Sequence, residues 1–266
     1  MNGSSIISLW TRALNRLYTT MMQLLKEREF SSNEGQSIRY MFFPSRKSNT
    51  LVIGFQACND AGARYNYVRT IQNCGVNRLF IKDDFGPNHC GDYYLGSNGT
   101  YSVEKAVYAL IDLFIDRTHP SKIIFIGSSK GGYAALNFGL SYPAANIVIA
   151  APQYYLGSYL DNPKWKENLE EILGENVTEE NKRALDLRLK RKISGDMFGN
   201  SQTIYIHYSD QEHTYKEHVK DLLEDLNGSG ISIHTDVGKY SVHEELKHYF
   251  PDYLQKTIRE IQKNVI

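Results

Sequence analysis

One stretch of the chain, residues 122–136, consists of an apolar strand pattern, a glycine- and serine-rich turn and a helix pattern of small residues. It contains Gly-x-Ser-x-Gly, with Ser129 at the centre and Gly127 and Gly131 two residues to either side. A serine on a sharp strand-to-helix turn has strained backbone geometry, and the residues two positions away must be small so that strand and helix can approach. The pattern predicts a nucleophile elbow. An ordinary glycine-rich turn or a phosphate cradle is the alternative.

Short apolar segments alternate with helical segments along the 266 residues, a length that suits one sizeable α/β domain. Thr50–Phe55 is continuously apolar, as expected of a parallel strand covered on both faces. The alternation predicts a mostly parallel sheet with helices on both faces, in a single domain spanning residues 1–266. Strands are expected at residues 37–44, 50–55, 77–84, 122–127, 146–151, 203–208 and 231–236, and further helices at 64–74, 102–116, 212–226 and 242–262.

Two segments stand outside this alternation. Hydrophobic residues recur mostly at steps of three to four from Ile6 onward, which predicts an N-terminal helix at about residues 5–29. That helix either packs on the domain or lies on a membrane surface. Residues 152–200 are charge-rich and helical in composition, and they lie between two expected strands. An insertion at this place predicts a helical lid over the site.

The bulk composition excludes several classes of protein. The 30 basic and 30 acidic residues cancel, so charge favours neither nucleic acid nor an anionic membrane surface as a partner. Three cysteines are too few for a disulfide framework, and reduced thiols are typical of the cytoplasm. No apolar run reaches transmembrane length, and the N-terminus lacks a signal-peptide pattern. We therefore expect a cytoplasmic protein without a transmembrane segment.

A serine nucleophile needs a general base, and the base needs an acceptor that orients it. In a sheet of this kind the partners follow the serine in the order acid, then histidine. Asp210 closely follows the strand that ends at Tyr208, and His243 lies in the loop after the last expected strand. The sequence therefore predicts that Ser129, Asp210 and His243 meet beyond the carboxyl ends of the strands.

Other interpretations of these positions stay open. Asp210 can instead cap the helix that follows it, with Glu212 as the alternative acid. His243 can be a surface histidine at a helix start. The rival histidines lie inside expected helices or strands, where packing accounts for them: His213, His218 and His248 in helices, and His207 and His234 in strands.

The oxyanion of a tetrahedral intermediate needs preorganised hydrogen-bond donors. The backbone N–H of Lys130 lies at the positive end of the helix after the elbow. A second donor is expected after the strand at residues 50–55, where the N–H of Gln56 is the first candidate and that of Ala57 the second. The side chain of Lys130 is either a substrate contact or solvated.

Substrate contacts are expected at the outlet of the strand at residues 77–84. Asp83 and Asp84 end this strand at the catalytic edge, where they either bind substrate hydroxyls or cap the loop. The loop that follows, Phe85 to Tyr101, contains Tyr93 and Tyr94, and loops of this length in compact domains are usually functional or mobile. We assign both aspartates and both tyrosines to substrate binding.

Three short patterns are rejected. Asp84-Phe85-Gly86 spells a kinase-like triplet, but the kinase glycine-rich and catalytic loops are absent. Residues 127–132 lack the Gly-Lys-Ser/Thr ending of a P-loop. The pair His89-Cys90 has no further spaced ligands for zinc. The sequence predicts neither a metal nor a cofactor.

From about Ser37 onward the chain resembles the α/β-hydrolase superfamily, through the elbow, Asp210 and His243 in strand-end contexts. Residues 80–86 (Phe-Ile-Lys-Asp-Asp-Phe-Gly) and 91–95 (Gly-Asp-Tyr-Tyr-Leu) are similar to bacterial accessory-secretion and capsular-polysaccharide-biosynthesis proteins. That resemblance implies transfer or removal of an acyl group, often acetyl, on a glycan or glycoprotein in the cytoplasm. Lys130 departs from the neutral residue that many hydrolases carry there, which puts the substrate in question more than the reaction.

Residues and resemblance together predict a serine esterase or acyltransferase that acts through an acyl-enzyme on an O-acyl group of a glycan or glycoconjugate. The alternative is a non-catalytic subunit of hydrolase fold that assists polysaccharide biosynthesis or protein export. A peptidase of the same fold is a weaker alternative, since the sequence gives no sign of a peptide pocket. A protein partner or a homo-oligomer stays open in each case.

Overall fold

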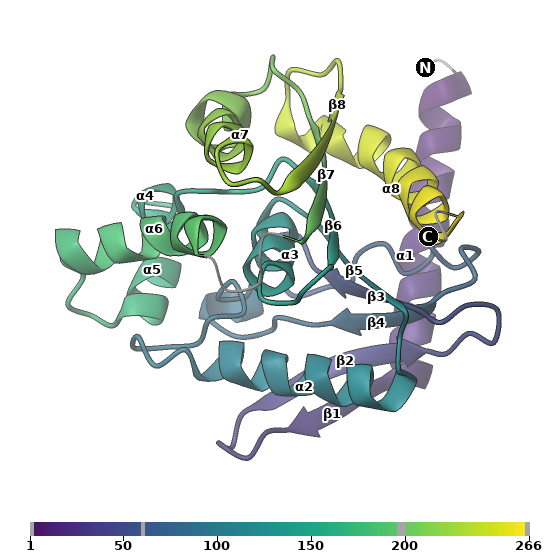
Figure 1. The fold of residues 1–266 in the computed structure, drawn as a ribbon, viewed down its shortest axis with the longest axis horizontal. Helices are drawn as coiled ribbons and strands as arrows, with labels where there is room; N and C mark the ends of the chain where they lie inside the picture. The colour runs from purple at the N-terminus through teal and green to yellow at the C-terminus, as the bar shows by residue number, and fades with distance from the viewer. Residues whose placement is uncertain (1–2, 60–61, 196–200, 264–266) are drawn as a thin grey trace.

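The computed structural model describes residues 3–59, 62–195 and 201–263, with side chains from residue 13 onward. These residues form an eight-stranded sheet in the order β1-β2-β4-β3-β5-β6-β7-β8 (Figure 1). The pairs β1–β2 and β2–β4 are antiparallel, and every other neighbouring pair is parallel. The strands are β1 Glu27–Ser31, β2 Ser37–Phe43, β3 Thr50–Phe55, β4 Asn77–Ile81, β5 Lys122–Ser128, β6 Asn146–Ala150, β7 Thr203–Tyr208 and β8 Ser232–Val237. The predicted mostly parallel sheet is confirmed.

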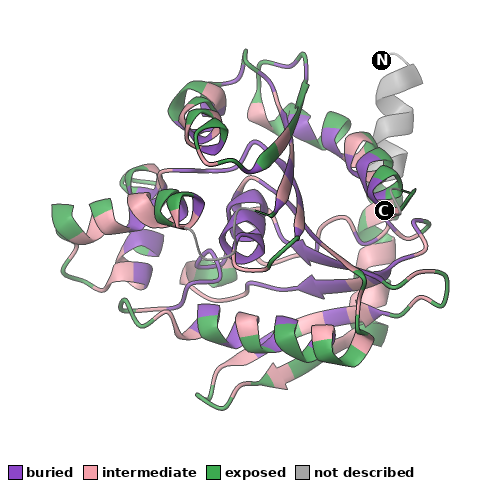
Figure 2. Ribbon diagram, in the orientation of Figure 1, coloured by how far each residue is buried: buried purple, intermediate pink, exposed green. Residues whose placement is uncertain are grey.

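Helices cover both faces of the sheet, as predicted (Figure 1). One face carries α2 Ser102–Thr118, α3 Lys130–Gly139 and α7 Lys220–Asn227, and the other carries α1 Gly3–Lys26 and α8 Leu246–Lys263. All six residues of β3 and all ten of α3 are buried, so the elbow lies at the centre of the molecule (Figure 2). This double cover explains why the central strands are continuously apolar.

The N-terminal helix ends earlier than the sequence predicts. Residues Glu27–Ser31, expected to be helical in part, form the edge strand β1 instead, because they pair in register with β2. Tyr18 and Met22 of α1 pack against the core beneath α8. Five large apolar side chains of α1 are nevertheless exposed: Leu14, Leu17, Met21, Leu24 and Leu25. No helix among the described residues is both long and apolar enough to cross a membrane.

The helix expected at residues 64–74 is absent, and turns take its place. Tyr67 has a φ of 61°, a left-handed conformation that a regular helix cannot contain. Tyr65, Val68 and Ile71 nevertheless pack under the sheet, so the apolar spacing reflects burial rather than helix. The segments expected to be helical at 212–226 and 242–262 are helical, but each opens differently, with a π-helical turn at Tyr215–Val219 and a 3-10 turn at His243–Glu245.

Three helices occupy the insertion between β6 and β7: α4 Leu156–Leu160, α5 Lys166–Leu173 and α6 Glu179–Ser194. Residues 196–200 of the expected lid lie outside the described part of the chain. The insertion is anchored to the domain because Arg188 of α6 binds the carboxylate of Glu104 in α2 at 2.7 Å. Lys192 of the same helix donates to the carbonyl of Asn137 in α3 at 2.5 Å.

Candidate active site

Ser129 lies between β5 and α3 in the geometry that the elbow pattern predicts. Its φ and ψ are 51° and −122°, a sparsely populated combination for a residue with a side chain. The flanking glycines are required sterically. A Cβ on Gly127 would overlap the carbonyl of Gly131, and a Cβ on Gly131 would lie 2.8 Å from the carbonyl oxygen of Phe55. The chain therefore holds a strained serine between two positions that admit no side chain.

The hydroxyl of Ser129 faces a cavity of about 670 Å³ that also contains the imidazole of His243. Gln153, which follows β6, donates from Nε2 to the Ser129 Oγ at 3.0 Å. Tyr159, Lys164 and Trp165 line the same cavity and belong to the insertion after β6. The insertion thus forms one wall of the cavity that holds the serine.

His243 opens the 3-10 turn before α8, and its Nδ1 contacts the Oε1 atom of Glu212. The hydroxyl of Thr214 lies 3.3 Å from the same nitrogen and also bonds to Glu212. Burial alone would raise the pKa of Glu212, but the hydrogen bonds from His243 and Thr214 outweigh it, so the net shift of the pKa is downward. An ionised Glu212 accepts a hydrogen bond from Nδ1–H and leaves Nε2 of His243 as the basic nitrogen.

The carboxylate next to His243 is therefore Glu212 and not the predicted Asp210. Asp210 is exposed in the turn after β7, and the described residues show no contact between it and His243. The side chain of Glu212 is only 1% exposed, and its Oε1 contacts Nδ1 of the imidazole. The sequence indicated Asp210 as the first candidate for the acid and Glu212 as the alternative. The contacts in the structure favour Glu212.

The rival histidines fall into distinct environments. His213 is exposed and lines the same cavity, with its ring centroid 6.0 Å from that of His243. His218 is buried against the insertion, where its Nδ1 accepts from the backbone N–H of Tyr155 at 3.4 Å. Burial lowers the pKa of His218 to about 4. His207 contacts Asp236 at 2.6 Å from within the sheet, as a face residue packed by aromatic rings. His213 also lies near Glu212, with its Nδ1 3.9 Å from Oε1, but among the described residues His243 is the cavity histidine that hydrogen-bonds to this carboxylate.

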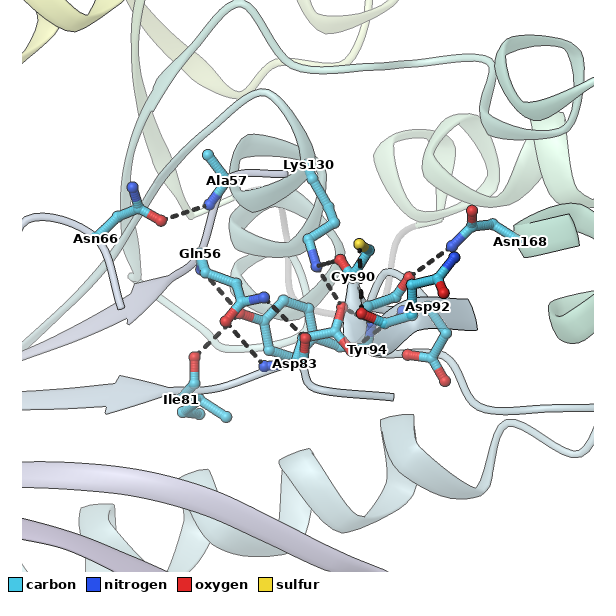
Figure 3. A network of polar contacts seen from close by, with 12 residues as sticks. Gln56, Ala57, Asn66, Ile81, Asp83, Cys90, Asp92, Tyr94, Lys130 and Asn168 are labelled. Carbon is cyan, nitrogen blue, oxygen red and sulfur yellow. Dashed lines mark hydrogen bonds and ion pairs between the residues drawn. The ribbon is translucent and has the colours of Figure 1, made fainter. Parts of the chain in front are cut away.

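The two predicted loop donors for an oxyanion are already engaged (Figure 3). The N–H of Gln56 donates to the hydroxyl of Tyr94 at 2.8 Å, and the N–H of Ala57 donates to Oδ1 of Asn66 at 2.9 Å. Ala57 and Asn66 line the cavity, whereas Gln56 is buried. The N–H of Lys130 opens α3, where the first amides of a helix have no intrahelical acceptor.

The side chain of Lys130 is neither solvated nor available to a substrate. It is 1% exposed, and its Nζ binds Asp83 Oδ2 at 2.8 Å and the carbonyl of Cys90 at 3.1 Å (Figure 3). Asp92 lies beside this pair, and burial together with the charge of Asp83 raises the pKa of Asp92 well above its usual range. Burial and the neighbouring charge thus favour the neutral form of Asp92 beside the Lys130–Asp83 ion pair.

The four residues assigned to substrate binding make contacts within the domain. Asp83 is fully buried and accepts from the backbone N–H groups of Asp92 and Tyr94 at 3.1 Å each. Tyr93 and Tyr94 are buried in the core, and Asp84 pairs with Arg39 at 2.9 Å. None of the four is among the residues that line the cavity of Ser129. Asp83 orders the long loop behind the elbow, because it binds that loop and Lys130 at once.

Sequence reasoning missed Gln153 and the cavity wall formed by Tyr159, Lys164 and Trp165. Gln153 follows directly from the end of β6, whose neighbour is β5, so its position beyond a central strand was the signal that could have identified it. The wall residues carry no local motif. They reach the cavity through the packing of the insertion, which depends on contacts far apart in the sequence.

Comparison with known proteins concerns the fold. No protein-family model and no curated protein matches the sequence. The capsule O-acetyltransferase of Neisseria meningitidis serogroup A in complex with CoA matches with a TM-score of 0.70 and 20% identity, over 89% of this chain and 99% of that chain. The S-formylglutathione hydrolase of Agrobacterium tumefaciens matches with a TM-score of 0.62 and 16% identity, over 89% and 94%. The chain has the α/β-hydrolase fold.

Another structure with this α/β-hydrolase fold is an assembly. A chain of the Glycosylation Associate Protein complex from Streptococcus agalactiae matches with a TM-score of 0.71 and 17% identity, over 90% of this chain and 47% of that chain. The predicted resemblance to the α/β-hydrolase superfamily is confirmed at the level of fold. These neighbours include enzymes that transfer or hydrolyse acyl groups and a protein named for association with glycosylation.

Proposed function

We propose that the protein is a serine acyltransferase or esterase in which Ser129 is the nucleophile, His243 the general base and Glu212 the orienting acid. One observation carries the proposal. The buried carboxylate of Glu212 contacts Nδ1 of His243, and His243 shares a cavity with the strained Ser129. A carboxylate on Nδ1 makes Nε2 the proton acceptor, which a serine hydroxyl needs in order to attack.

The reaction follows from these positions. His243 removes the hydroxyl proton of Ser129, and Oγ forms a bond to the acyl carbon of an ester or thioester. The bond to the leaving alcohol or thiol breaks, and His243 returns the proton to that group. Water or a sugar hydroxyl then attacks the acyl-enzyme and gives its proton to His243, and His243 passes a proton to Oγ of Ser129 as the acyl–Oγ bond breaks. Water as the acceptor gives hydrolysis, and a sugar hydroxyl gives transfer.

The N–H of Lys130 supplies one donor for the developing oxyanion in this proposal, and the N–H of Ala57 supplies the second. Ala57 replaces Gln56 because Ala57 and its acceptor Asn66 both line the cavity, where an oxyanion would take the place of the Asn66 side chain. The amide of Gln56 is held by a tyrosine hydroxyl that is itself fully buried. The N–H of Gln56 is therefore occupied by Tyr94 and is not accessible to a substrate.

Transfer of an acyl group to a glycan is the form of the reaction that the comparisons favour. The neighbour solved with CoA is a capsule O-acetyltransferase, so a CoA thioester is the proposed donor and a glycan hydroxyl the proposed acceptor. Trp165 and Tyr159 supply aromatic surface at the cavity wall, of the kind that packs against a sugar ring. The insertion that carries both residues is the proposed lid.

The test is covalent labelling and turnover. The wild-type protein should gain one adduct mass with a serine-directed fluorophosphonate, mapped to Ser129, and should hydrolyse p-nitrophenyl acetate. The S129A variant should lose the adduct and the turnover while its thermal unfolding stays within a few degrees of wild type. Turnover that survives in S129A would contradict the proposal.

A non-catalytic role is the second candidate, and the similarity to a chain of a glycosylation-associated complex favours it. In that case the protein assists a biosynthetic or export partner. A wild-type protein that is inert to the fluorophosphonate and co-purifies with one partner would support this role over catalysis.

A further inference from the structure

A second cavity, of about 450 Å³, lies next to the cavity of Ser129, and the two share Asn66, Tyr67 and Lys247 as lining residues. We propose that this second cavity, which we call the cationic cavity, binds phosphate groups of the substrate whose reacting end lies at Ser129. That the reacting end of the ligand lies at Ser129 rests on the proposed function. That the other end carries phosphate groups is inferred from the residues that line the cavity.

The charged residues that line the cationic cavity are all positive. Four of its lining residues are cationic: Arg16, Arg64, Arg69 and Lys247. No aspartate or glutamate is among the described residues that line it. None of these four side chains lies within ion-pair distance of a carboxylate in the part of the chain that the structure describes. Cations clustered in this way raise the local concentration of anions and favour the binding of an external anion.

The chemistry of the lining suits phosphate better than a single carboxylate. Three of the cations are arginines, whose planar guanidinium groups bind two phosphate oxygens at once. The hydroxyls of Thr19 and Thr20 and the amide of Gln23 add neutral donors from α1. Several cations around one space favour a ligand with several negative charges, such as a pyrophosphate or a phosphate monoester next to a diester.

The geometry of the cationic cavity is held in place by contacts between its walls. Arg69 donates from Nη1 to Oδ1 of Asn15 at 2.8 Å, which ties the turn after Tyr67 to α1. The hydroxyl of Tyr67 bonds to Oγ of Ser128 at 2.5 Å, next to the nucleophile. Burial raises the pKa of Tyr67 to about 12, so this hydroxyl stays neutral. Tyr67 thus stands at the junction between the two cavities.

A ligand that spans both cavities would place its acyl group at Ser129 and its phosphates between α1 and α8. This placement gives the N-terminal helix a part in substrate recognition, because Arg16 belongs to α1 and lines the cavity. Phosphates of this kind occur in a CoA thioester donor and in a sugar-phosphate acceptor. We propose the binding of phosphate groups, which both ligands carry, and the experiment shows which of the two ligands supplies them.

The experiment measures binding by calorimetry on the S129A protein, so that no turnover is needed. Three probes are titrated at low salt: inorganic pyrophosphate, CoA and N-acetylglucosamine 1-phosphate. Pyrophosphate should bind, and the double variant R16A/R64A should weaken its binding by about tenfold or more. Raising the ionic strength should weaken wild-type binding as well, because both arginines act through charge. The matched control K220A removes an exposed lysine of α7 and should change the dissociation constant less than about twofold.

The three probes show whether the bound phosphate groups belong to the acyl donor or to the acceptor. Tight binding of CoA that is lost in R16A/R64A places the donor in the cationic cavity, and the same result with the sugar phosphate places the acceptor there. If none of the three probes binds, or if R16A/R64A binds them as S129A alone does, the proposal is overturned. Should the double variant fail to fold, K247A replaces it, since Lys247 is exposed. A missing fluorophosphonate adduct would reject the catalytic role of Ser129 without affecting these binding results.

Discussion

Exchange of the acid that contacts His243 is the sharpest test of the proposed mechanism. The E212Q variant removes one charge and keeps the size of the side chain. With carboxylate and imidazole in hydrogen-bond contact, the charge centres are about 4 Å apart, and at an effective dielectric constant of about 20 their attraction amounts to about 4 kcal/mol. That attraction stabilises the imidazolium that forms as Ser129 attacks, so its loss should lower kcat by about a thousandfold.

The matched control is D210N, two residues away. Asp210 is exposed and has no contact with His243 among the described residues, so kcat should stay within about twofold of wild type. Both variants are assayed by p-nitrophenyl acetate hydrolysis under saturating substrate, with circular dichroism to confirm the fold. A thousandfold loss in D210N together with near-normal turnover in E212Q would refute the assignment of Glu212 and restore Asp210 as the acid.

Two further predictions concern buried charge. The K130M variant leaves Asp83 without its buried partner, which should lower the free energy of unfolding by about 3–5 kcal/mol and Tm by about 10 °C. The control K220M, at an exposed position, should leave Tm unchanged. Equal melting temperatures of the two variants in differential scanning calorimetry would contradict the structural role of Lys130. Because burial lowers the folded-state pKa of His218 to about 4, the unfolded chain binds the proton first as pH falls. In urea unfolding, the free energy of unfolding should therefore fall by up to about 3 kcal/mol between about pH 6.5 and pH 4. The H218Q variant should show a flatter dependence on pH. If the free energy of H218Q falls with pH as steeply as that of wild type, this role of His218 is contradicted.

Local patterns in the sequence predicted the elements that depend on near neighbours. The elbow is such a case, because the steric demand on Gly127 and Gly131 comes from atoms within the strand, the turn and the adjacent loop. The apolar strands also follow from burial on both faces. The edge strand β1 escaped prediction because its charged residues have no apolar alternation, and only pairing with β2 makes them a strand.

The site was harder to predict, since its contacts join residues far apart in the chain. Asp210 and Glu212 lie two residues apart, and the conformation of one turn decides which carboxylate reaches His243, 31 residues further along than Glu212. Lysine is rarely buried unless it is paired, so nothing local indicates that Lys130 points inward. Its partner Asp83 lies 47 residues earlier, and the pairing emerges only when β4 and β5 both flank β3.

The energetic cost of the elbow bears on the choice between an enzyme and a non-catalytic subunit. A left-handed serine costs of order 1–3 kcal/mol, and such strain persists only where the surroundings over-determine the backbone. Here the surroundings include a buried lysine–aspartate pair, which by itself contributes little to stability because both charges lose their hydration. That pair fixes the residue immediately after Ser129 against the loop behind it. A subunit that only supported a partner could relax the turn and replace both charges with apolar side chains. Retention of strain and buried charge at one point, with His243 in the same cavity and a buried carboxylate at its Nδ1, favours a serine that reacts.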